Sequence, residues 1–196
     1  MVRSFSGRAV PSETLERVLV SSRRAPAAGN TDGWDAVVLR GPEQTDAFWQ
    51  ATTTAEWRES SRRWPGLSRA PVVVCVFSHP GSYLDRYDEP DKRGSGLGHP
   101  EGEGGGQGSW PVPFWFVDAG FGVLIMLLSA TDAGLGACFL GNFRGEVDLC
   151  NVLGVPPGRR YLGAVLMGEP GEKDPPSPSL HRTRRPAEAV FHYGHW

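Results

Sequence analysis

Residues 117–146 read VDAGFGVLIMLLSATDAGLGACFLGNFRGE, an apolar segment followed directly by a short strand-like run. From Phe116 to Asp132 apolar side chains cover nearly every side of a predicted helix, which is typical of a helix running through the middle of a protein. Gly134 suits the left-handed position just beyond a helix end. Residues 137–141 then form a predicted strand. This passage therefore predicts a buried central helix joined tightly to a strand.

The clearest strand lies upstream, at residues 71–77 (PVVVCVF). A continuous run of β-branched residues without alternation indicates a strand that is buried on both faces of a sheet. Other segments show the hydrophobic spacing or the turn signals of regular elements. They predict strands over 35–40 and 160–167, and helices over 12–24 with Ser12 as the N-cap, over 42–51 and over 146–153.

The chain has 196 residues and a net charge of −2, so it offers no basic field for nucleic acid or an anionic membrane. Its length fits one domain over residues 1–196. The Gly-rich stretch 94–108 is interpreted as a mobile surface loop. The apolar run 119–128 is shorter than the roughly 20 residues that cross a bilayer. Because Met1 leads into polar residues without a signal peptide, we expect a cytoplasmic protein.

Metal and hydrolase motifs are not expected to carry the chemistry. Cys75 and Cys138 lie in apolar runs and are interpreted as packing thiols, and His192 with His195 lacks nearby ligands, so no metal site is predicted. No GxSxG nucleophile elbow occurs. The basic residues near the end, such as Arg185, suit a phosphate, but composition alone favours a solvated tail.

Six stretches, taken in order, resemble the flavin-dependent nitroreductase superfamily over almost the whole chain. Each is weakly specific alone, and their order and spacing carry the resemblance. They are RSFSGRAVPSETLERVL (3–19), APAAGNTDGW (25–34), RAPVVVCVF (69–77), the passage 117–146 quoted above, LGVPPGRRYLGAVLMGEP (153–170) and RTRRPAEAVFHYG (182–194).

The resemblance implies an α+β nitroreductase-like fold, with a central mixed or antiparallel sheet flanked by helices. Members are intertwined homodimers with two FMN sites at the subunit interface. The extension 182–196 would pack on the partner subunit. Arg3, Arg182 and Arg184 match the residues that grip the cofactor phosphate. Family members normally carry further residues upstream, including an Arg-Arg-Ser-like triplet, so the chain resembles a shortened member. Either its start is assigned too late or it binds FMN more weakly.

The resemblance also implies which residues meet the flavin ring. Gly141 occupies the position whose backbone N–H meets flavin N5, and a fixed donor there orients the ring without adding an acid. No catalytic side chain is therefore expected. The other residues implied at the ring are Leu140 and Asn142 beside Gly141 and, across the interface, the turn residues Pro26, Ala27, Ala28 and Asn30.

The aromatic stretch after the Gly-rich loop is the candidate substrate surface. Trp110 and Phe114 are interpreted as pocket residues for a flat substrate, while Trp115 and Phe116 begin the central helix. Arg144 is a candidate partner for an anionic group. The resulting prediction is an FMN-dependent enzyme that passes electrons from NAD(P)H to a small organic acceptor such as a nitroaromatic or quinone. The alternatives are a flavin-dependent dehydrogenase of a natural-product intermediate and an inactive flavin-binding module.

Overall fold

The computed structural model describes residues 1–99, 106–142, 144–174 and 176–196. Most of the predicted Gly-rich loop, residues 100–105, therefore lies outside the described residues. Its two ends contain single turns of 3-10 helix, Arg93–Ser95 and Gln107–Ser109.

A four-stranded antiparallel sheet forms the middle of the molecule, in the order β1-β2-β4-β3. Its strands are β1 (Trp34–Arg40), β2 (Val72–Ser78), β3 (Gly136–Leu140) and β4 (Arg160–Gly168). Every residue of β2 is buried, as the β-branched run predicted. The expected α+β architecture is thus confirmed, with an antiparallel sheet.

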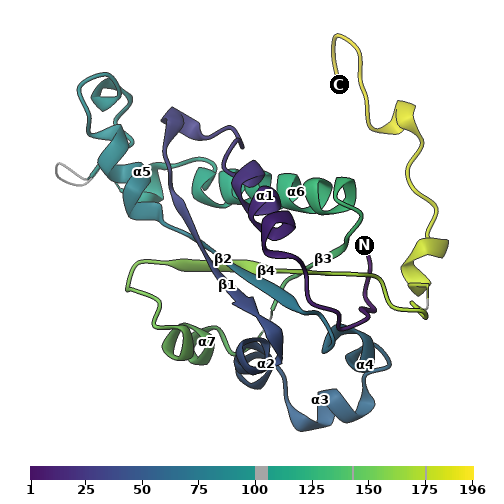
Figure 1. The fold of residues 1–196 in the computed structure, drawn as a ribbon. Coiled ribbons are helices and arrows are strands. Elements are labelled where there is room, and N and C mark those ends of the chain that lie inside the picture. The colour runs from purple at the N-terminus through teal and green to yellow at the C-terminus, as the bar shows by residue number, and fades with distance from the viewer. Residues whose placement is uncertain (100–105, 143, 175) are drawn as a thin grey trace.

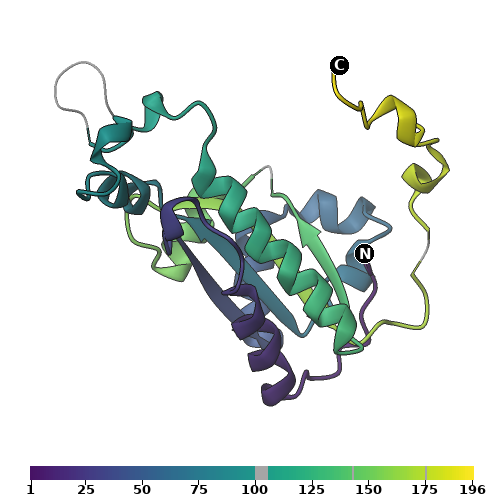
Figure 2. The same ribbon diagram turned by 90° about the horizontal axis from the view of Figure 1, so that it is seen from above.

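Helices cover both faces of the sheet (Figures 1 and 2). Side chains of a strand point alternately to opposite faces, so β2 supplies two different cores. One face packs with α1 (Ser12–Ser22) and α6 (Phe114–Asp132) around residues such as Val74. The opposite face packs with α2 (Gly41–Thr52) and α7 (Glu146–Leu153) around Cys75 and its neighbours.

Helix α6 confirms the predicted central helix, and its burial in the single chain is one-sided. Gly122 lies so close to β1 that an added Cβ would be 2.9 Å from Trp34 Cζ2. On the other side Phe121, Leu124 and Leu128 are 41%, 52% and 62% exposed. The 19-residue helix is long and apolar enough to cross a membrane by length and composition alone, unlike the shorter run considered above. Its packing on the sheet identifies it as a core-covering helix.

Three short helices complete the fold where the sequence shows no long period. They are α3 (Ala55–Ser60), α4 (Trp64–Leu67) and α5 (Pro80–Tyr87), the last two with Pro in the first turn. Proline is favoured there because the first N–H groups of a helix have no internal partner. Helix α1 also differs from expectation: Pro11, not Ser12, precedes the first helical residue, and the helix ends at Ser22.

Residues 176–196 form a C-terminal tail that runs away from the body in both views (Figures 1 and 2). Nearly all of its described residues are exposed. Its backbone hydrogen bonds join residues three or four apart, such as Phe191 N–H to Ala187 O at 2.8 Å. The fold of the tail is therefore local.

Candidate functional site

A cavity of ≈400 Å³ opens where β3 ends, beside the end of α2 and helices α3 and α4. This volume lies in the range of small-molecule sites, roughly 300–1,000 Å³. Four residues predicted from the sequence line it together: Leu140, Gly141, Asn142 and Arg144. The other lining residues are Trp49, Thr52, Thr53, Thr54, Trp57 and Leu67.

The end of α2 builds one wall of this cavity. The Thr52 hydroxyl donates to the Phe48 carbonyl at 2.7 Å and the Thr53 hydroxyl to the Trp49 carbonyl at 2.5 Å. Such bonds compete with the backbone ladder and tend to bend or weaken a helix. Arg58 then donates through Nε to Thr53 Oγ1 at 2.8 Å. The threonine run is thereby held at the cavity edge.

The opposite wall is the backbone after β3. Gly141 is exposed, and an added Cβ there would meet nothing within 4 Å, so its peptide is open toward the cavity. The Tyr161 hydroxyl donates to Asn142 Oδ1 at 2.8 Å. Burial raises the pKa of Tyr161, which keeps this donor protonated. With its oxygen so paired, the Asn142 amide presents its NH₂ donors elsewhere.

Charge at the cavity is concentrated on Arg144, which is exposed. The pKa of Glu56 on α3 is lowered, chiefly by a backbone hydrogen bond and by the Thr54 hydroxyl, with the positive charge of Arg144 adding to the effect. Buried nearby, Trp49 Nε1 is a donor without a hydrogen-bond partner among the described residues. The cavity thus combines aromatic and aliphatic walls with several donors and one cation.

The turn between α1 and β1 is the second predicted element, and its backbone is unusual. Gly29 has φ of 65° and Asn30 has φ of 55°, both in the left-handed region. A Cβ on Gly29 would lie 2.9 Å from Tyr87 Cε2, so only glycine fits. The turn is therefore held in one shape by its own sequence and by α5.

Asp118 anchors this turn from inside α6. Its side chain is almost fully buried, with 2% exposed, and Oδ2 accepts from the Ala28 N–H at 2.8 Å and from the Tyr83 hydroxyl at 2.8 Å. Burial raises the pKa of Tyr83, and the hydrogen bond to Asp118 raises it further. Arg86 adds a bond from Nε to the Gly29 carbonyl at 2.8 Å. These anchors were not predicted from the sequence, although Asp118, a carboxylate near the start of an apolar helix, was a visible signal.

Arg3 lies in a different hollow, of ≈200 Å³, beside Arg62 and Arg63. Burial raises the pKa of Cys138, and the charges of Arg3 and Arg63 both act against that rise. Arg182 and Arg184 are exposed in the tail. Within one chain, Arg3 therefore lies beside Arg62 and Arg63 and not beside the two arginines of the tail.

Trp110 packs inside a small aromatic cluster. It is 8% exposed, its ring centroid lies 4.7 Å from that of Tyr87, and its Nε1 donates to the Leu97 carbonyl at 2.9 Å. Phe114 is half-buried in the same cluster. In the single chain, neighbouring rings therefore cover Trp110, so it does not form an open aromatic surface there. Trp115 is a core residue, as predicted.

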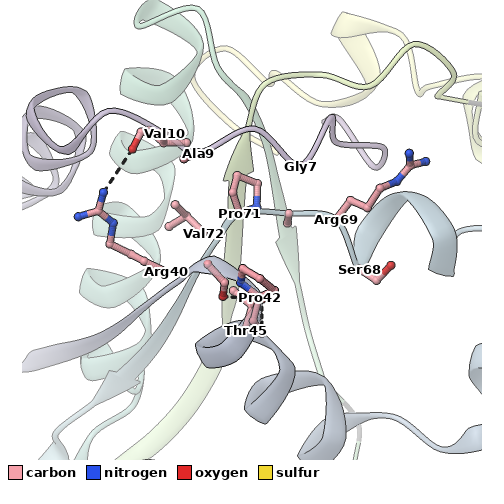
Figure 3. Close-up of a pocket in the computed structure, with 12 residues that line it drawn as sticks. Gly7, Ala9, Val10, Arg40, Pro42, Thr45, Ser68, Arg69, Pro71 and Val72 are labelled. Carbon is pink, nitrogen blue, oxygen red and sulfur yellow. Dashed lines mark hydrogen bonds between the residues drawn. The ribbon is translucent and has the colours of Figure 1, made fainter.

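Another cavity, of ≈500 Å³, lies near the starts of α2 and β2 (Figure 3). Its polar groups are largely engaged within the chain: Arg40 donates to the Val10 carbonyl at 3.3 Å and Thr45 Oγ1 to the Gly41 carbonyl at 3.0 Å. None of the predicted site residues lines it. The cavity beside Gly141 is therefore the candidate functional site.

Two groups of predicted residues thus lie on opposite sides of the sheet in one chain. The turn 26–30 belongs to the side of the sheet covered by α1 and α6, whereas the cavity beside Gly141 belongs to the side covered by α2. One wall of that cavity was predicted from the sequence. The other, formed chiefly by Trp49, residues 52–54 and Trp57, was not. The threonine run 52–54 was the available signal, but Thr hydroxyls also bond to nearby backbone without any ligand.

Comparisons with known proteins agree with this architecture. The Nitroreductase family model matches residues 1–99 and 106–169. A protein of Archaeoglobus fulgidus with a provisional NADH dehydrogenase/NAD(P)H nitroreductase name is 26% identical over 177 residues, covering 88% of this chain and 82% of its own. The NADH dehydrogenase of Thermus thermophilus is 26% identical over 192 residues, covering 91% and 86%.

Solved structures show the same fold. NfrA2 of Bacillus megaterium aligns with a TM-score of 0.72 and 18% identity, covering 100% of this chain and 70% of its own. A nitroreductase family protein from Streptococcus pneumoniae aligns with a TM-score of 0.66 and 18% identity, covering 97% and 94%. With the family model matching most of its length, the chain belongs to the Nitroreductase family.

Proposed function

We propose that the chain is a subunit of an FMN-dependent oxidoreductase that passes electrons from NAD(P)H to a small organic acceptor. The observation that supports this most directly is the cavity beside Gly141, lined by Leu140, Asn142 and Arg144. Family membership supports an oxidoreductase in general terms. The finer assignment rests on how well the cavity suits a flat, polar-edged ring.

The donor set of the cavity fits such a ring. An isoalloxazine has apolar faces and an edge of carbonyl and ring-nitrogen acceptors, and it supplies two-electron redox chemistry when bound. Leu140, Leu67 and Trp57 offer apolar contact, while the Asn142 amide and the threonine hydroxyls offer donors. The unpaired Trp49 Nε1 is a further donor at the same wall. We therefore assign this cavity as the ring site.

The residues of this chain would bind and orient the ring and would not act as acids or bases. The open peptide of Gly141 admits a close approach, because no Cβ stands in the way. Tyr161 fixes the Asn142 amide. Arg144 at the rim attracts an anionic acceptor. Aromatic neighbours such as Trp57 would stack a flat substrate and exclude water.

The proposal includes a homodimer whose partner supplies the turn 26–30. Two apolar surfaces of the single chain are exposed. One is the outer side of α6, with Phe121, Leu124 and Leu128. The other is the tail, where Phe191 is 63% and Trp196 95% exposed. Patches of this kind mark protein–protein interfaces. A second copy would bring its turn, held by Asp118, toward the ring site.

Gly141→Val tests the proposed cofactor site. The structure gives the new side chain open space, so the fold is expected to be kept, while the branched group occupies the ring site. We expect FMN affinity to fall at least about 100-fold, roughly 2.7 kcal/mol, in titrations of flavin fluorescence. Gly94→Val is the matched control, since Gly94 also has open space but lies outside the cavity.

Two results would contradict the proposal. One is equal FMN affinity in Gly141→Val and the unaltered protein, with both folded by circular dichroism. The other is an unaltered protein that binds no FMN at micromolar concentrations, or that binds it and is not reduced by NADH or NADPH. Reduction by an organic donor alone would favour the dehydrogenase alternative instead.

A further inference from the structure

The cavity near the starts of α2 and β2, called the Arg40 cavity below, has the size of a small-molecule site (Figure 3). Its volume is ≈500 Å³, and such sites span roughly 300–1,000 Å³. The residues that line it come from the segments 7–10, 40–45 and 68–72. The described lining of this cavity and that of the cavity beside Gly141 have no residue in common, so the two cavities are separate.

The Arg40 cavity has an apolar floor and an open rim. Val10, Ala70 and Val72 line it and are buried, so they form the floor. Ala9 and Pro42 line it and are exposed, so they lie at the rim. Among the described lining residues there is no aromatic ring and no carboxylate. The cavity therefore offers aliphatic contact, without a ring on which a flat ligand could stack.

Hydrogen bonds within the chain hold the walls of the Arg40 cavity in place. The Gly41 N–H donates to the Pro71 carbonyl at 2.9 Å and joins the start of α2 to the start of β2. The Arg40 N–H donates to Gln44 Oε1 at 2.8 Å, and Thr45 Oγ1 donates to the Gly41 carbonyl at 3.0 Å. A ligand that enters a cavity with fixed walls loses little free energy to ordering the protein.

The guanidinium of Arg40 brings one positive charge to the rim. Its Nη2 donates to the Val10 carbonyl at 3.3 Å and to Ser12 Oγ at 3.1 Å, and both acceptors are neutral. The ion pairs formed in the part of the chain that the structure describes do not include Arg40. A guanidinium has five N–H donors. The two bonds through Nη2 therefore position the group and leave donors and an uncompensated charge for a ligand.

The other arginine of the lining, Arg69, is directed elsewhere. Its Nε donates to the Pro65 carbonyl at 2.8 Å, and Figure 3 shows its guanidinium turned away from Pro71 and Val72. The cavity thus presents a single cation, which matches a singly charged anion better than a doubly charged phosphate. A carboxylate is such an anion, and a guanidinium can bind its two oxygens through parallel charge-assisted hydrogen bonds.

We infer that the Arg40 cavity binds a small aliphatic carboxylate. The carboxylate pairs with the guanidinium of Arg40, and the aliphatic chain lies on the floor formed by Val10, Ala70 and Val72. The charge of the ligand follows from the single cation, and its aliphatic body follows from the lining. This site goes beyond the proposed function, because it is separate from the cavity assigned to the ring.

Titration calorimetry of the full chain with octanoate tests this site, and 1-octanol is the matched ligand without a carboxylate. We expect octanoate to bind with a dissociation constant below about 1 mM and at least about 10-fold more tightly than octanol, a typical gain for one charge-assisted bond. In Arg40→Gln this difference should disappear, with octanol binding unchanged. Arg40→Lys keeps the charge and should keep most of the difference. Arg17→Gln, on the exposed side of α1, is the control for lost charge.

A second variant tests the place of the aliphatic chain. Ala9→Trp puts a large side chain at the exposed rim, where the fold has room for it, and should weaken the binding of octanoate and octanol alike. Circular dichroism shows whether each variant is folded. Saturating FMN should leave the dissociation constant of octanoate unchanged, because the two sites share no described lining residue.

Several results would overturn the inference. They are equal affinities for octanoate and octanol, unchanged octanoate binding in folded Arg40→Gln, and displacement of octanoate by FMN. Inorganic phosphate that binds the cavity more tightly than octanoate would also overturn it, because the assigned ligand is a singly charged carboxylate. A protein that binds octanoate through Arg40 and binds no FMN would support this site and refute the proposed function.

Discussion

The α1–β1 turn and the C-terminal tail are both predicted to reach the same cofactor, yet their contacts with the rest of the chain differ completely. The turn is bonded to Asp118 and Arg86, residues that lie far along the sequence. The tail is bonded mainly to itself: His192 stacks on Trp196 at 4.5 Å between ring centroids, and its backbone bonds join near neighbours.

This difference bears on how the proposed site would be assembled. The turn arrives preformed, because left-handed backbone at Gly29 and buried hydrogen bonds fix its shape before any partner or cofactor binds. The tail has large apolar side chains without a surface to cover in its own chain, for example Tyr193 at 92% exposed. In the proposed dimer, the partner subunit would supply the surface that this tail covers. The turn is thus fixed by one chain, whereas the place of the tail depends on the proposed dimer.

Deleting the tail is expected to have the largest effect. A chain ending at Asp174 keeps the bond to Arg3 but loses Leu180, Phe191 and Trp196. Burial of such a side chain contributes about 1.5–3 kcal/mol, so the dimer dissociation constant should rise at least about a thousandfold, roughly 4 kcal/mol. Sedimentation equilibrium measures this constant.

The far-ultraviolet circular dichroism of the deleted form should stay close to that of the full chain. Val20→Ser removes an exposed apolar side chain from α1 and serves as the control. A deleted chain that still forms the dimer with unchanged affinity would show that the tail is not a dimer element. A deleted chain that unfolds would show that the tail contributes to the fold after all.

Replacing the turn's anchor is expected to act on the single chain instead. Asp118→Ala leaves the Ala28 N–H and the Tyr83 hydroxyl without their acceptor. Stranding buried donors costs about 1–3 kcal/mol each, so the free energy of unfolding should fall by about 3 kcal/mol in urea titrations. Tyr83→Phe keeps the bond to Ala28 and should cost about 1 kcal/mol. Equal losses in the two variants would contradict the proposed anchoring.

The sequence predicted the elements whose signal lies within the element itself. The β-branched run gave β2, and the apolar stretch gave α6 and β3 within two residues at either end. The one-sided exposure of α6 was not predictable, because composition shows that a helix is apolar and not which surface covers it. Helix α3 was not predicted because a helix of 6 residues is too short to show a hydrophobic period.

The residues of the candidate site were predicted where they are neighbours in sequence, and missed where they are not. Leu140, Gly141 and Asn142 follow one another, and the structure places them together with Arg144. The bond from Asp118 to Ala28 joins residues 90 positions apart, and no local pattern encodes it. Trp110 shows the same limit, since an aromatic residue near a loop is equally suited to a pocket and to a packed cluster.

The smallest expected effect lies at His79, just before α5. Its backbone N–H donates to the Gly33 carbonyl at 2.8 Å and its ring Nδ1 lies 2.6 Å from Ser82 Oγ. Burial lowers the pKa of His79, helped by the positive charge of Arg159, while Asp35 and Asp85 oppose the shift. The folded protein therefore binds fewer protons here than the unfolded chain, whose histidine titrates near about 6.5.

It follows that the contribution of His79 to stability is complete above about pH 6.5 and is lost as the pH falls through the lower pKa of the folded state. His79→Gln should flatten the acid side of the stability profile, measured by urea unfolding between about pH 5 and 7. His192→Gln, in the exposed tail, should leave the profile unchanged because its ring does not contact the sheet. Identical stability profiles for His79→Gln and the unaltered protein would show that the acid sensitivity comes from another group. A flattened profile in His79→Gln alone would show that His79 stabilises this region within one chain.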